Sequence, residues 1–70
     1  MSLIGKKVIH KKYGDEGIIK HVEIIHTEFV FKILLTIEFE IDYDLLTYKT
    51  LYNEVRIVWN EFNFFSTKFR

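Results

Sequence analysis

The 70-residue sequence contains no cysteine and no proline, and its three glycines all lie within the first seventeen residues. Without cysteine, neither a disulfide framework nor a thiolate metal site can support the fold. The absence of cysteine is also typical of proteins from a reducing compartment. No proline-rich stretch, low-complexity segment or internal repeat marks a linker. We therefore expect residues 1–70 to form a single domain.

A long uninterrupted apolar run is also missing. Lys32 interrupts the most apolar stretch, Phe29–Ile37, and no basic-then-apolar leader opens the chain. These absences favour a soluble, cytoplasmic protein without a signal peptide or a membrane span. A chain this short buries only about 60% of the surface that its unfolded form exposes, so its core must be rich in apolar side chains. Hydrophobic residues make up 49% of the sequence, which meets that need.

The sequence has no excess charge of either sign, which argues against a generic polyanion binder. The charges are nevertheless unevenly distributed, because residues 1–12 carry four lysines and no acidic residue, whereas residues 33–54 have a net charge of −4. The four lysines are Lys6, Lys7, Lys11 and Lys12. A basic edge and an acidic edge can orient a partner. Solvated strand faces, with lysines that protect strand edges from aggregation, are the alternative explanation.

Two apolar runs near the N-terminus predict a β-hairpin. Lys7–His10 and Ile18–Ile25 are rich in β-branched residues, which favour strands. Between them, Gly14 and Gly17 bracket two acidic residues, a combination typical of a compact turn.

The strongest pattern is a strict alternation over Phe29–Ile41. Its apolar members are Phe29, Phe31, Ile33, Leu35, Ile37, Phe39 and Ile41. Because side chains alternate between the two faces of a strand, this segment is expected to place one wholly apolar face against a core. The opposite face becomes acidic through Glu38, Glu40 and Asp42. A flat strand of this length spans roughly 43 Å, so we expect it to bend, to contain a bulge or to run along two layers of a barrel.

The last third predicts a helical turn followed by a closing strand. Apolar residues with the spacing of a helical face are Leu45, Tyr48, Tyr52 and Val55. We therefore expect one or two helical turns within Thr47–Glu54, capped by Thr47 or Thr50. Val55–Trp59 then has the composition of a strand.

The end of the sequence is unusually aromatic, with Phe62, Phe64, Phe65 and Phe69. So much apolar surface is not typical of a free terminus. Two hypotheses follow: this tail packs back and completes the core, or it forms a surface for a partner or for self-association.

A resemblance to a known family rests mainly on the first hairpin. The residues that carry it are Gly5, Val8, His10, Tyr13, Gly14, Gly17 and Ile19, in the pattern G-x-x-V-x-H-x-x-Y-G followed by G-x-I. This opening resembles that of small SH3-like barrels of the Tudor/CarD type, which include the C-terminal domain of UvrD/PcrA-type helicases. Thr36–Phe39 is similar to the family's third strand, and Leu46–Ile57 to a later strand, a short turn and the closing strand. The sequence departs from the family in the longer gap between Gly14 and Gly17 and in its long segment Ile24–Leu35.

The resemblance implies an all-β fold, a small SH3-like (Tudor-like) five-stranded barrel with one short helical turn near the C-terminus. It also implies docking onto proteins of the transcription, repair or nucleic-acid machinery, and it implies no catalysis.

The residues themselves give no sign of a catalytic or metal site. The only histidines are His10, His21 and His26, and no cysteine or close histidine pair completes a ligand set. We expect His10 to hydrogen-bond neighbouring backbone while packing beside Tyr13, and the other two to lie on the surface. No nucleophile signature or glycine-rich phosphate loop is present. We therefore expect no catalytic residue, no metal, no cofactor and no small-molecule substrate.

Binding residues are sought among lysines and aromatics. The four N-terminal lysines have the chemistry to grip phosphates. Aromatic rings stack bases or form a Tudor-style cage for a cationic side chain. Because Phe29, Phe31 and Phe39 belong to the predicted core face, tyrosines are the better candidates. The predicted partner-binding residues are Lys6, Lys7, Lys11, Lys12, Tyr43, Tyr48 and Tyr52.

The expected function is that of a non-enzymatic, stand-alone adaptor or inhibitor that docks onto a protein partner of the nucleic-acid machinery. A phage- or mobile-element-encoded inhibitor of host machinery is a specific version. The alternative is direct DNA or RNA binding through the lysine cluster, which the zero net charge and the acidic middle segment disfavour. An acidic face that imitates DNA is a further possibility, although five carboxylates are few for that role. We expect a monomer or a weak homodimer and no membrane association.

Overall fold

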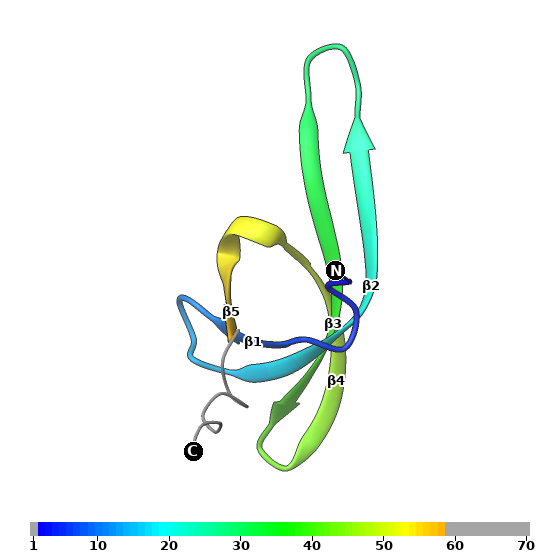
Figure 1. Ribbon diagram of the computed structural model, residues 1–70. Helices are drawn as coiled ribbons and strands as arrows, with labels where there is room; N and C mark the ends of the chain where they lie inside the picture. Colours follow the sequence, from blue (N-terminus) through cyan, green and yellow to red (C-terminus); the bar gives the residue numbers. More distant parts are fainter. Residues whose placement is uncertain (1, 59–70) are drawn as a thin grey trace, which may run out of the picture.

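The computed structural model describes residues 2–58, which form five strands and one short 3₁₀ helix. The elements are β1 (Lys7–His10), β2 (Glu16–His26), β3 (Phe31–Ile41), β4 (Asp44–Leu51), η1 (Tyr52–Glu54) and β5 (Val55–Val58). All neighbouring strands are antiparallel, in the order β4-β3-β2-β1-β5 (Figure 1). The predictions of an all-β fold with five strands and one short helical turn are confirmed.

The β2–β3 hairpin is much longer than the strands beside it. β1 pairs with β2 only along Glu16–Ile18, and β4 reaches along β3 only as far as Leu34. Residues 20–33 therefore extend as a two-stranded projection, here called the arm, away from the remaining strands, here called the body (Figure 1). At the tip, the Thr27 hydroxyl accepts a hydrogen bond from the Val30 amide at 3.0 Å and so closes the turn.

A bulge in β2 marks the boundary between body and arm. The pairing of β2 with β3 shifts between Ile19 and His21, so Lys20 is the extra residue. An extra residue bends a strand and increases its twist. A bend or bulge was predicted for the long alternating segment; the irregularity lies in the strand that pairs with it.

The core lies within the body, and its apolar side chains come from four elements. The buried hydrophobic residues are Val8, Ile19, Leu35, Ile37, Phe39 and Val55. The predicted core face of the alternating segment is therefore confirmed over Leu35–Phe39, flanked by half-buried Ile33 and Ile41. It is wrong for Phe29 and Phe31, whose side chains are 88% and 64% exposed, because both lie on the arm, which no other described strand covers.

The predicted helix over Thr47–Glu54 is largely wrong. Residues up to Leu51 belong to β4, and only Tyr52–Glu54 are helical. Neither threonine is the cap, because η1 begins after Leu51 without a side-chain capping bond. Thr50 instead lies opposite Leu35 in the ladder and is buried. The eight residue pairs between β3 and β4 stabilise a strand here more than the helical spacing of a few apolar side chains stabilises a helix.

The first turn also differs from the expectation that both later glycines bracket it. Gly14 has a φ of +77°, and its amide donates a hydrogen bond to the His10 carbonyl at 2.8 Å, so it does belong to the turn. Gly17 lies inside β2, between Val8 and Phe39 on the adjacent strands. A Cβ atom there would lie 2.6 Å from Cγ2 of Ile37 and 2.8 Å from the carbonyl oxygen of Glu38, so close strand contact requires glycine.

The closing strand is confirmed for Val55–Val58, whereas Trp59 and the aromatic tail lie outside the described residues. Both hypotheses about the tail therefore stay predictions. Within residues 2–58, no helix is long and apolar enough to cross a membrane.

Candidate functional site

The structure distributes the predicted binding residues over several parts of the body. Lys7 on β1 forms an ion pair with Glu16, with 3.0 Å between Nζ and Oε1. Lys6 precedes β1, and its carbonyl accepts the Ile19 amide. Lys11 and Lys12 are exposed in the turn that follows β1. The four lysines therefore do not form one uniformly basic edge, because at least one of them faces an acidic partner.

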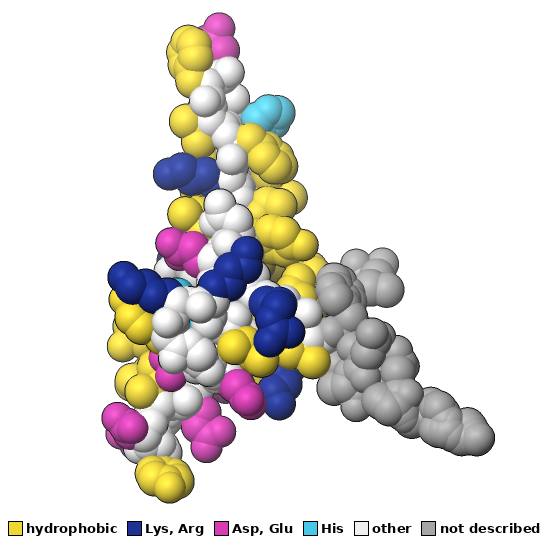
Figure 2. All heavy atoms as spheres, turned by 90° about the vertical axis from the view of Figure 1, so that its left-hand side faces the viewer, with side chains coloured by type: hydrophobic (Ala, Val, Ile, Leu, Met, Phe, Trp, Pro, Cys, Tyr) yellow, Lys and Arg dark blue, Asp and Glu magenta, His cyan; other side chains and the backbone are white. Residues whose placement is uncertain are grey.

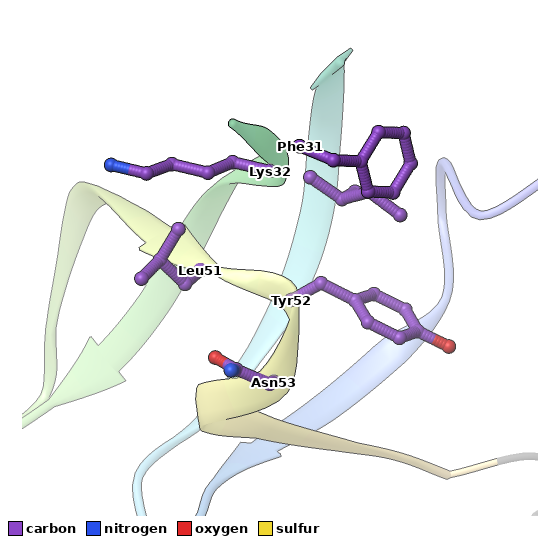
Figure 3. Close-up of a pocket in the computed structure, with 6 residues that line it drawn as sticks. Phe31, Lys32, Leu51, Tyr52 and Asn53 are labelled. Atoms are coloured by element: carbon purple, nitrogen blue, oxygen red, sulfur yellow. The ribbon is translucent and has the colours of Figure 1, made fainter. Parts of the chain in front are cut away.

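The three predicted tyrosines also lie apart. Tyr43 is 98% exposed in the β3–β4 turn, where Asp42 and Tyr43 both have positive φ angles. Tyr52 begins η1 and lines a hollow of about 360 Å³ beside Phe31 (Figure 3). Tyr48 alone lies near the turn that carries Lys12, because it lines the same groove as Tyr13.

Four aromatic rings from three strands and a turn form a continuous row across the body. The His10 and Tyr13 rings are 4.8 Å apart, those of His10 and Phe39 6.2 Å, and those of Phe39 and Tyr48 6.4 Å. The middle of the row is fixed by burial, since Phe39 is only 3% exposed. Its ends are open, with Tyr13 67% and Tyr48 52% exposed.

This row is the wall of a groove of about 390 Å³. The lining residues are His10, Tyr13, Asp15, Phe39, Ile41, Tyr48, Lys49, Thr50 and Glu54. They come from β1, the first turn, β3, β4 and η1, so the groove exists only in the folded sheet. We define the aromatic groove by these residues.

His10 holds the turn that carries Tyr13. Its Nδ1 atom accepts hydrogen bonds from the backbone amides of Lys12, at 3.1 Å, and Tyr13, at 3.3 Å. The expectation that His10 bonds neighbouring backbone and packs beside Tyr13 is confirmed, and its role is to position the groove's outer wall.

The charges at the aromatic groove favour a cationic ligand. Asp15 and Glu54 both line it, and the single lysine of the lining, Lys49, lies 4.0 Å from Glu23. The ammonium of Lys12 is 5.4 Å from the centroid of the Tyr13 ring, a cation–π distance. Within the chain, Lys12 therefore already supplies a cation to the Tyr13 ring, and a ligand's cation would have to replace it there or contact Tyr48 instead.

Sequence reasoning identified two binding residues at the aromatic groove, Tyr48 in its lining and Lys12 beside it. It missed Tyr13, Asp15 and Glu54 as groove residues. Tyr13 was expected as part of the family pattern and as the packing neighbour of His10, but not as a binding residue. Its position three residues after His10, inside a turn, indicates an exposed ring, because a side chain in such a turn does not reach the core. Glu54 had no local signal, because its position depends on how η1 returns the chain to β1, where its carbonyl accepts the Lys11 amide at 3.0 Å.

Among the residues that the structure describes, no three histidine or carboxylate side chains gather as a metal site would require. We compared the chain with models of protein families, with curated proteins and with solved structures, and none matches. Function is therefore inferred from the groove and the fold.

Proposed function

We propose that this chain is a non-enzymatic binding module, an adaptor or inhibitor that docks onto a protein partner through the aromatic groove. The observation that carries the proposal is the row of four rings that ends in two exposed tyrosines beside Asp15 and Glu54. Exposed tyrosines bind with little loss of side-chain entropy and are enriched where proteins recognise one another.

The expected ligand is a basic side chain, lysine or arginine, of that partner. Aromatic faces attract cations by roughly 0.5–1 kcal/mol at exposed sites and by about 2 kcal/mol when water is excluded. Two carboxylates at the same groove add electrostatic complementarity, which favours a basic partner and disfavours an acidic one. The apolar lining residues Phe39 and Ile41 suit the methylene part of such a side chain.

For the arrangement of the five strands, we propose an SH3-like barrel. Three features support it: the meander from β1 to β4, the return of β5 to pair with β1, and the 3₁₀ turn between β4 and β5. The first hairpin's resemblance to barrels of the CarD and helicase C-terminal type extends the proposal to a partner from the nucleic-acid machinery. A phage- or mobile-element-encoded inhibitor of host machinery is its most specific version.

Direct nucleic-acid binding is disfavoured by the charges around the lysines. Lys7 faces Glu16, and Lys20 lies 3.6 Å from Glu38. Figure 2 shows basic and acidic side chains interspersed over the visible face of the body, without a broad basic surface. Phosphate binding depends on several uncompensated cations along one track.

Affinity capture with matched variants tests the proposal. The immobilised full chain is exposed to cell extract, captured proteins are identified by mass spectrometry, and the affinity of each purified candidate is measured by calorimetry. We expect Tyr48→Ala to weaken binding about tenfold or more, the effect of losing roughly 1.4 kcal/mol. Tyr43→Ala, at the exposed β3–β4 turn outside the groove lining, is the control and should bind like the original chain.

Two results would contradict the proposal. One is a partner whose affinity is the same for Tyr48→Ala and Tyr43→Ala. The other is capture of nucleic acid rather than protein, with affinity that falls steeply with salt and disappears when Lys6, Lys7, Lys11 and Lys12 are replaced by alanine.

A further inference from the structure

One face of the arm is apolar and uncharged. Residues directly opposite in an antiparallel pair share a face, so Ile24 and Ile33, and His26 and Phe31, lie on the same side as Val22 and the buried core residue Leu35. None of the six is a carboxylate or an amine. Two charged strand residues of the arm, Glu23 and Lys32, belong to the opposite face, and a third, Lys20, is the bulge at its base.

Much of this face is open to solvent. Ile24 is 62% and Phe31 64% exposed, and Phe29 at the tip is 88% exposed. Figure 2 shows hydrophobic side chains along one flank of the arm, and Figure 3 shows the rings of Phe31 and Tyr52 on the same side of the ribbon, away from Lys32 and Leu51. Apolar surface gathered on one side in this way marks an interaction site.

The β2 edge of the arm is a second, independent sign of a missing neighbour. Next to β1, the Gly5 amide donates a hydrogen bond to the Ile19 carbonyl, and the Ile19 amide donates one to the Lys6 carbonyl. The pairing along this edge of β2 ends at Ile19. Among the described residues, His21–His26 pair with β3 on one side, and Lys20–His26 pair with no strand on the other. Free N–H and C=O groups along such an edge are a template for another strand.

We propose that this edge pairs with the same edge of a second copy, antiparallel, with Ile24 opposite Ile24 across a two-fold axis. In this register Glu23 lies opposite Ile25 and Val22 opposite His26 of the second copy, so the apolar faces of the two arms merge into one four-stranded face. A register centred on Glu23 is disfavoured, because it sets two carboxylates opposite each other.

Charge complementarity selects a second copy and the antiparallel direction. Lys20 lies at the base of the arm, 3.6 Å from Glu38 of its own chain and 55% exposed, and Glu28 lies at the tip. The two-fold axis brings Lys20 of each copy to Glu28 of the other, whereas a parallel pair would set lysine beside lysine. The chain's zero net charge adds no long-range repulsion between copies. An isologous contact of this kind closes as a dimer and leaves no free repeat for fibre growth.

The dimer is weak because the contact is small. Seven residues of strand span roughly 23 Å. The area covered falls well below the roughly 800 Å² per partner of a standard stable interface. We therefore expect dissociation constants between micromolar and millimolar.

Sedimentation velocity of the full chain, from micromolar to millimolar concentration, tests the dimer. We expect the original chain to shift from monomer to dimer. Ile24→Glu should stay monomeric, because it sets two carboxylates face to face on the axis. Leu45→Glu is the matched control: Leu45 on β4 is 65% exposed, close to the 62% of Ile24, and this variant should dimerise normally. Circular dichroism of both variants checks that the fold is kept.

A charge exchange tests the register. Lys20→Glu and Glu28→Lys should each weaken the dimer several-fold, and the double variant should recover most of the loss. A monomer at millimolar concentration overturns the proposal, and so does a dimer that Ile24→Glu and Leu45→Glu form equally. Magnetic-resonance contacts between the arm and residues 59–70 of the same monomer would also overturn it, because the chain's own tail would then cover the face. Ile24, Lys20 and Glu28 do not line the aromatic groove, so this failure would leave the proposed function standing.

Discussion

Residues in the alternating segment share a pattern but differ greatly in burial. Ile37 is fully buried between its neighbouring strands, whereas Phe29 is 88% exposed although both belong to the same apolar series. The alternation predicts which side of a strand a residue faces, because that depends only on backbone geometry. It does not predict whether another layer lies on that side. Within β3 the strict period therefore predicted the face correctly and the depth incorrectly, and Phe29 lies before the strand begins.

Substitution by aspartate should distinguish the buried position, Ile37, from the exposed position, Phe29. Ile37→Asp is expected to unfold the protein, because an unpaired buried carboxylate costs several kcal/mol, a large part of a typical stability of about 5–15 kcal/mol. Phe29→Asp should change the free energy of unfolding by no more than about 0.5 kcal/mol, as surface substitutions usually do. Urea denaturation followed by circular dichroism measures both. Comparable losses for the two variants would contradict the burial described for the arm.

The strands of the hairpin and the closing strand were predictable from local composition, but the end of β4 was not. The spacing of Tyr48, Tyr52 and Val55 fits a helix, yet Tyr48 lies opposite Ile37 in the β3–β4 ladder. Pairing with a long neighbouring strand decides the structure there, and a single sequence does not record which strands become neighbours. The same limit applies to the aromatic groove. Tyr48 was identified by type, but the row of rings required His10 and Phe39 to meet in space.

At the scale of elements, the arm should be less stable than the body. Its hydrogen bonds join two strands alone, and its side chains contribute little to the core, whereas β1 lies between β2 and β5. Amide hydrogen exchange, measured at micromolar concentration to keep the chain monomeric, should be faster for Ile24 and Ile25 than for Val8 and Ile9. Equal protection in both regions would mean that the arm unfolds only with the whole domain.

The whole molecule presents two surfaces of different character. The aromatic groove combines rings and carboxylates on the body, and the arm offers an apolar face and a free strand edge. The missing nucleophile signature, phosphate loop and metal-ligand set led to the prediction of a binding protein rather than an enzyme, and it stays a prediction. Net charge and composition did not distinguish these surfaces, because the lysines counted as one cluster are in part paired with acidic residues once the sheet forms.

The most direct measurement of the central proposal is a magnetic-resonance titration of the full chain with two short capped peptides. One is Gly-Arg-Gly and the other is Gly-Glu-Gly, so they differ only in the charged side chain. We expect the arginine peptide to shift the resonances of Tyr13 and Tyr48 in a saturable way and to leave Tyr43 unchanged. The glutamate peptide should shift none of them. No shift at Tyr13 and Tyr48 with the arginine peptide, or equal shifts with both peptides, would contradict a groove that binds a partner's basic side chain.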